Sequence, residues 1–143
     1  MEPIIDHIQI TVRNIAEAEA FYDRLMPLLG FDLSKRGKGV VPEREFEAIE
    51  YVHRNIVVGI NSPRSQYRDE VVHRRKPGSL HHLAFRAPNR VEIDRLFPLI
   101  KEIGATMIES PRFYPEHGPA YYALYFKDPS GIKLEIMHEE RVS

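Results

Sequence analysis

The chain carries the same order of motifs twice, and this repeat constrains the fold more than any other feature of the sequence. Residues 6–12 (DHIQITV) and 81–87 (HHLAFRA) are both rich in β-branched or aromatic side chains, which favours strands. Each stretch is followed by an asparagine, Asn14 or Asn89. His7 and His82 lie 75 positions apart, as do Asn14 and Asn89. A spacing that stays constant through successive elements indicates an internal duplication.

Each asparagine is expected to cap a helix that ends near a glycine. Glu17 and Glu92 follow the asparagines at the third position, which is the spacing of a capping box. Apolar side chains then recur on one helical face until Gly30 in the first half and Gly104 in the second. We therefore predict one helix in each half of the chain.

Three further strands are predicted after each helix. The first of them is short, FDLSK from residue 31 or ATMIE from residue 105, and a strand pair follows it, FEAIEYV with IVVGIN or AYYALYF with IKLEIM. Each half is therefore βαβββ, which predicts an α+β fold whose two modules form a curved mixed sheet. We expect a single domain over residues 1–143, with module 1 at about 1–60, a linker at 61–79 and module 2 at about 80–140.

The composition excludes several classes of partner. Twenty basic residues oppose 21 acidic ones, so the net charge of −1 gives no field that would attract nucleic acid or an anionic membrane. No apolar run approaches the ~18 residues that a membrane span requires. We see no signal peptide, and a cytoplasmic protein is the expectation. Because the chain has no cysteine, any metal ion must be held by His, Asp or Glu.

Strand alternation predicts which histidines face a site. In the first strand, His7 and Gln9 fall on the side opposite the apolar Ile8 and Ile10, which suit packing against a helix. The repeat places His82 where His7 stands, so His81 is expected on the other face. Ala84 and Arg86 share the row of His82. Such a polar row on a curved sheet is what a small-molecule pocket requires.

Glu135 completes a set of metal ligands by the same argument. In the last strand it belongs to the polar row, near the strand centre, where a carboxylate is costly unless it is paired, hydrogen-bonded or bound to a cation. His7, His82 and Glu135 together form the two-histidine, one-carboxylate set typical of non-haem iron(II) sites. The same ligand types suit zinc, manganese or nickel, so the identity of the ion stays open.

The motifs resemble those of the vicinal oxygen chelate superfamily, which includes glyoxalases, bleomycin-resistance proteins and extradiol dioxygenases. The resemblance rests on the first strand with its histidine, the helix end FYDRLMPLLGF and the final DPSGIKLE. It implies paired βαβββ modules around a metal ion, with ligands at His7, Gly59, His82 and Glu135. Glycine offers no ligating side chain, so this chain keeps three ligands, as extradiol dioxygenases and fosfomycin-resistance proteins do.

Further site residues are predicted around the three ligands. The resemblance implies an active-site tyrosine at Tyr125, ten residues before Glu135. His117, in a loop, suits an acid–base role, which histidine side chains commonly fill in active sites. The substrate-binding candidates are Gln9, Tyr121 and Arg86.

Two classes of function remain open from the sequence. The chain could be a metal-dependent dioxygenase, or a glyoxalase-type lyase or isomerase, that binds a small organic substrate through two adjacent oxygens. It could instead be a metal-free binding or sequestering protein of the bleomycin-resistance type, with aromatic walls at Phe113, Tyr114, Tyr121, Tyr122 and Tyr125. A homodimer is expected, paired through the strand FEAIEYV. Metal content discriminates between the two classes, and the sequence does not identify the substrate.

Overall fold

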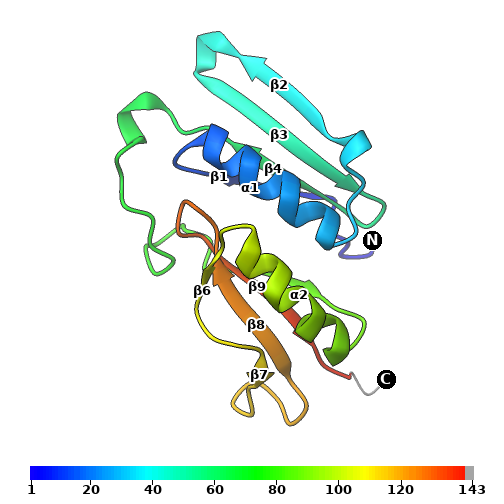
Figure 1. Ribbon diagram of the computed structural model, residues 1–143. Helices are drawn as coiled ribbons and strands as arrows, with labels where there is room; N and C mark the ends of the chain where they lie inside the picture. Colours follow the sequence, from blue (N-terminus) through cyan, green and yellow to red (C-terminus); the bar gives the residue numbers. More distant parts are fainter. Residues whose placement is uncertain (141–143) are drawn as a thin grey trace. The chain divides into compact units, whose positions relative to one another are not determined.

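The computed structural model describes residues 1–140 and consists of two units, Met1–Val72 and the remainder from His73. Each unit is a sheet with one helix on one of its faces (Figure 1). The order of elements repeats, so the α+β class with two modules is confirmed. The single-domain organisation stays a prediction.

The first unit contains β1 (His7–Thr11), α1 (Ile15–Leu28), β2 (Gly37–Val41), β3 (Phe46–His53) and β4 (Ile56–Asn61). Its strand order is β1-β4-β3-β2, with β1 parallel to β4 and the other neighbours antiparallel. Ile10 is buried, whereas His7, Gln9 and Thr11 are exposed, so β1 alternates as its sequence predicts.

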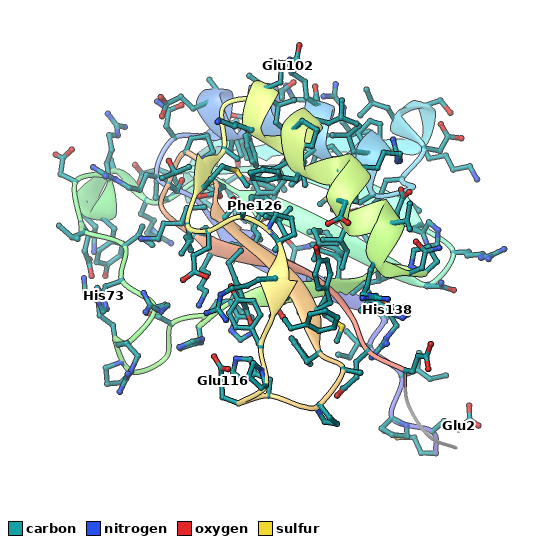
Figure 2. All side chains as sticks on the ribbon, turned by 60° about the horizontal axis from the view of Figure 1, so that its bottom comes forward. Glu2, His73, Glu102, Glu116, Phe126 and His138 are labelled. Atoms are coloured by element: carbon teal, nitrogen blue, oxygen red, sulfur yellow. The ribbon has the colours of Figure 1, made fainter. Side chains whose placement is uncertain are left out.

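The second unit contains β5 (Leu83–Arg86), α2 (Arg90–Glu102), β6 (Thr106–Met107), β7 (Arg112–Phe113), β8 (Tyr122–Lys127) and β9 (Lys133–His138). The order β5-β9-β8-β6 repeats that of the first unit, and β7 pairs with β8. In Figure 2, the labelled Phe126 lies between α2 and the strands that the helix covers. Leu124, Phe126, Leu134 and Ile136 are almost completely buried.

The asparagine and glycine signals define both helices. The Asn14 side chain accepts a hydrogen bond from the backbone N–H of Glu17 at 3.0 Å, and Asn89 accepts one from Glu92 at 2.9 Å. Gly30 and Gly104 each follow the helix at φ 93°, a left-handed conformation that L side chains rarely adopt. The two helices therefore begin and end where the sequence predicts.

Two expectations about strands from the sequence are wrong, although FEAIEYV does form a strand paired with IVVGIN as predicted. Residues 33–35 of FDLSK form a 3-10 turn, because the Asp32 side chain caps it by accepting from Ser34, and the second strand of the unit begins only at Gly37. FEAIEYV, expected as an exposed pairing strand, is β3, which is paired on both sides by β2 and β4. The edge strands of this sheet are β1 and β2. No helix within residues 1–140 has the length and hydropathy to cross a membrane.

Candidate metal and substrate site

Glu135 lies at the centre of β9 and is fully buried, which is unusual for a carboxylate. It faces Tyr125 directly across the β8–β9 ladder. The Tyr121 hydroxyl donates a hydrogen bond to Oε1 of Glu135, so this oxygen has a partner. The carboxylate is therefore fixed in orientation by its strand and by one phenol.

The other carboxylate oxygen of Glu135 has no hydrogen-bond donor. Oε2 is buried without a hydrogen-bond partner, although Nε2 of His82 lies 3.1 Å away, so the approach is close but not that of a hydrogen bond. Two ligand atoms each about 2.1 Å from one ion, at right angles to each other, would be about 3 Å apart. The donor pair His82 Nε2 and Glu135 Oε2 therefore fits adjacent positions on a divalent cation, and a cation would satisfy the orphaned oxygen.

His82 reaches Glu135 from just before a strand rather than from within it, because β5 begins at Leu83. Alternation therefore does not extend to His81, and the prediction that His81 turns away from His82 is wrong. The Nδ1 atoms of the two histidines are 2.7 Å apart and their rings are in edge contact. This contact holds the His82 ring with Nε2 toward Glu135, as hydrogen-bonded partners do for metal-bound histidines.

Aromatic side chains cover the sheet beside Glu135. Tyr114 and Tyr125 are buried and in edge-to-face contact with centroids 5.1 Å apart, and Tyr121 packs against the same cluster. His117 stacks on Tyr114 and lies 5.3 Å from the Tyr121 ring. Its loop, marked by Glu116 in Figure 2, lies on the side of the strands away from α2. The structure thus brings Tyr121, Tyr125 and His117 close to Glu135.

Both tyrosines beside Glu135 remain protonated at neutral pH. Burial raises the pKa of Tyr125, and the neighbouring carboxylate of Glu135 raises it further. Burial and the hydrogen bond to Glu135 likewise raise the pKa of Tyr121. Each phenol can therefore donate a hydrogen bond but is a poor base, which suits an orienting role more than proton abstraction.

Two of the predicted aromatic walls face elsewhere. The Tyr122 hydroxyl donates to Asp94 on α2, and the rings of Tyr122 and Phe113 are in edge contact. The Arg90 guanidinium, also on α2, lies over the ring of Phe113. Because side chains alternate along β8, Tyr122 belongs to the face that the helix covers, and only Tyr114, Tyr121 and Tyr125 remain as walls.

His7, in the first unit, is held in a similar way to His82. Its side chain is 58% exposed, and its Nδ1 donates to Oδ1 of Asp6 at 2.7 Å, since an ionised carboxylate can only accept. Nε2 is the nitrogen left for a ligand, in the carboxylate–histidine arrangement common at metal sites. The role of His7 as a metal ligand stays a prediction from the sequence.

The position of Gly59 is not vacant. A Cβ built on Gly59 would lie 2.6 Å from the amide carbon of Gln9, so the Gln9 side chain fills the space that a ligand at 59 would take. The Gln9 amide also donates to Glu50 at 3.4 Å, one strand further across the sheet. The expected vacancy beside Gly59 is thus occupied by a polar side chain that can move.

Arg86 lies at the far end of its strand from His82. Its guanidinium donates to the backbone carbonyl of Glu139 at 2.8 Å. The strand ladder pairs Arg86 with Met137, two residues beyond Glu135 and therefore on the same face of the sheet. The structure shows no contact that tests the predicted role of Arg86 in substrate binding.

Within either unit, up to residue 140, no three His, Asp or Glu side chains converge as metal ligands would.

Tyr121→Phe is expected to weaken metal binding by about 10- to 100-fold, the effect typical of losing a partner of a ligating carboxylate. The phenol donates to Oε1 of Glu135 and so leaves Oε2 for the ion. Competition with a chromophoric chelator measures the dissociation constant. Tyr122→Phe removes a hydroxyl from the opposite face and serves as the control. Equal affinities of the two variants would contradict the role of Tyr121.

Comparisons with known proteins agree with this fold. Residues 4–136 match the model of the Glyoxalase/Bleomycin resistance protein/Dioxygenase superfamily. The chain is 24% identical over 132 residues to 2,2',3-trihydroxybiphenyl dioxygenase of Sphingomonas paucimobilis, a match covering 92% of the chain but only 40% of that enzyme.

Two solved structures share the fold over nearly the whole chain. A Bacillus halodurans protein described as a candidate glyoxalase superposes with a TM-score of 0.77 at 26% identity, covering 96% of this chain and 97% of the other. A glyoxylase/bleomycin resistance protein/dioxygenase domain from Frankia sp. EAN1pec gives 0.78 at 20% identity, with coverages of 98% and 100%.

Proposed function

Because the chain belongs to the glyoxalase/bleomycin resistance protein/dioxygenase superfamily, we propose that it is a divalent-metal-dependent enzyme acting on a small organic substrate through two adjacent oxygens. One observation carries this proposal: Oε2 of the buried Glu135 has no hydrogen-bond donor and lies 3.1 Å from Nε2 of His82. A buried carboxylate with one oxygen that lacks a hydrogen-bond donor is unfavourable unless a cation compensates it.

The proposed ligands are His7, His82 and Glu135, with each histidine offering Nε2. The bound ion would act as a Lewis acid toward two neighbouring substrate oxygens. Gly59 contributes no side chain, and Gln9 above it can hydrogen-bond a substrate or move aside. A three-ligand set of this kind leaves coordination positions for the substrate.

The remaining residues have roles that do not depend on which ion binds. The Tyr125 phenol, kept protonated by burial, would donate a hydrogen bond to a substrate oxygen. His117, exposed on its loop and in contact with the Tyr121 ring, would transfer protons as a general acid–base. Tyr121 positions Glu135, and Gln9 and Arg86 remain predicted substrate contacts.

The reaction class depends on the ion. Iron or manganese would favour ring cleavage with dioxygen, and the likeness to a dioxygenase supports this class. Zinc or nickel would favour a lyase or isomerase reaction of the glyoxalase type. We also propose a cytoplasmic homodimer, for which β1 and β2, and not β3, are the edge strands of the first unit.

A second candidate function is metal-free binding of a small aromatic molecule. The observation that favours it is the cluster of Tyr114, Tyr121 and Tyr125, which presents π faces together with phenol donors. In this case the protein would bind its ligand equally well before and after treatment with a chelator.

Elemental analysis of protein purified without chelators tests the first candidate. We expect about one iron, manganese, zinc or nickel ion per chain in the wild type and a strongly reduced content in His7→Ala, because one of three ligands is lost. His53→Ala is the matched control, since His53 contacts the backbone N–H of Asn55 in the same unit. Wild-type protein that contains no metal and gains none from any of these ions would refute the proposal.

A further inference from the structure

Two lysines face each other across the strands beside Glu135. Lys127 on β8 and Lys133 on β9 are direct cross-strand partners, one row from the pair Tyr125 and Glu135. Because side chains alternate along a strand, all four lie on the same face of the sheet. Like charges placed directly opposite each other are destabilising. Both lysines are half-buried, and within residues 1–140 neither has a carboxylate within ion-pair distance.

Lys133 is directed toward the aromatic wall and not toward an acid. Its Nζ lies 4.4 Å from the centroid of the Tyr125 ring. The Tyr125 ring supplies a π face to the ammonium group, which attracts a cation without neutralising its charge. The ammonium group is thus held near the site without a neutralising partner.

More positive charge gathers at the same place. Arg74 and Arg75 lie within electrostatic range of His81, and Arg74 lies within range of Lys133 as well. The arginines come from the segment before β5 and belong to the same unit as Lys133. The row next to Glu135 therefore carries an excess of cations over the single buried carboxylate, which favours an anion there.

We propose that Lys133, supported by Lys127, binds an anionic group of the substrate, so that the substrate is a small aromatic acid. This inference rests on the proposed function, in which His82 and Glu135 lie at the end where the two adjacent oxygens bind. Residues two apart on a strand are about 6.6 Å from each other, comparable to the span of a benzene ring with a substituent at each end. The Tyr125 ring lies beside both ends, with its centroid 6.4 Å from that of His82 and 4.4 Å from Nζ of Lys133.

Calorimetric titration of the metal-loaded protein with 3,4-dihydroxybenzoate and with catechol tests the proposal, because the two probes differ only in the carboxylate. We expect the acid to bind at least about tenfold more tightly, since a hydrogen-bonded ion pair in a half-buried site has an effect of this size. Lys133→Met should abolish the difference while leaving the catechol affinity unchanged, and Lys133→Arg should keep most of it. Lys101→Met, on the exposed end of α2, is the control.

Equal affinities for the two probes in the wild type, or a preference that persists in Lys133→Met, would overturn the inference. Benzoate separates this failure from failure of the proposed function, because it has the carboxylate but no adjacent oxygens. Benzoate binding that is lost in Lys133→Met and insensitive to chelator supports the anion site even if the protein holds no metal. Absence of benzoate and dihydroxybenzoate binding alongside metal-dependent catechol binding overturns the anion site alone.

Discussion

Glu135→Gln is expected to lower the affinity for a divalent ion by at least about 100-fold, a larger loss than any partner of a ligand should cause. The substitution keeps the shape of the side chain and the acceptor for the Tyr121 hydroxyl, but it removes the negative charge at Oε2. Chelator competition and elemental analysis measure the loss. Glu102→Gln, at the exposed end of α2, should bind metal like the wild type.

The metal-free protein should respond to Glu135→Gln in the opposite sense. A buried carboxylate without a donor at one oxygen destabilises the apo protein, so removing its charge should leave the melting temperature unchanged or raise it. Added metal should then raise the melting temperature of the wild type but not of the variant. A variant that melts well below the apo wild type would show that Glu135 stabilises the fold itself, against its assignment as a ligand.

The repeat in the sequence predicted the order of elements because each signal is local. Asn14 and Asn89 cap their helices through side chains that reach only three residues ahead. Gly30 and Gly104 take up left-handed conformations that depend only on their own backbone. Interactions of this range can be recognised without knowing the tertiary contacts.

The errors arose where a local preference met a competing neighbour. FDLSK has the apolar content of a strand, but the Asp32 side chain caps a 3-10 turn there, so pairing is delayed to β2. His81 was assigned by alternation although the strand begins two residues later, so its ring turns to His82. Both mistakes are shifts of an element boundary, which sequence patterns define poorly.

Part of the site could have been found by extending the alternation argument. Lys127 stands two residues after Tyr125, and Lys133 two residues before Glu135, so the pattern already places all four on one face. What the sequence does not contain is the cross-strand register that sets the two lysines opposite each other. The hydrogen bond of Tyr121 to Glu135 is likewise a product of the loop between β7 and β8, whose path no periodicity describes.

Ile93→Ala on α2 is expected to lower the free energy of unfolding by about 3 kcal/mol, within the range for large-to-small changes in a core. Ile93 is fully buried, and α2 packs its apolar face on β8 and β9, so the lost side chain leaves a cavity between layers. The midpoint of urea denaturation, recorded on the metal-free protein to exclude ligand effects, gives the change.

Val91→Ala, two residues earlier on the same helix, is the matched control. Its side chain is 75% exposed, and alanine is the better helix former, so the free energy of unfolding should change by no more than about 0.5 kcal/mol. The contrast between the two variants tests which face of α2 packs on the sheet. The assignment of Tyr125, Lys133 and Glu135 to the opposite face of the sheet depends on that result. Similar losses in the two variants would mean that the helix presents a different face, and the assignment of the site to the face of β8 and β9 that α2 does not cover would fail with it.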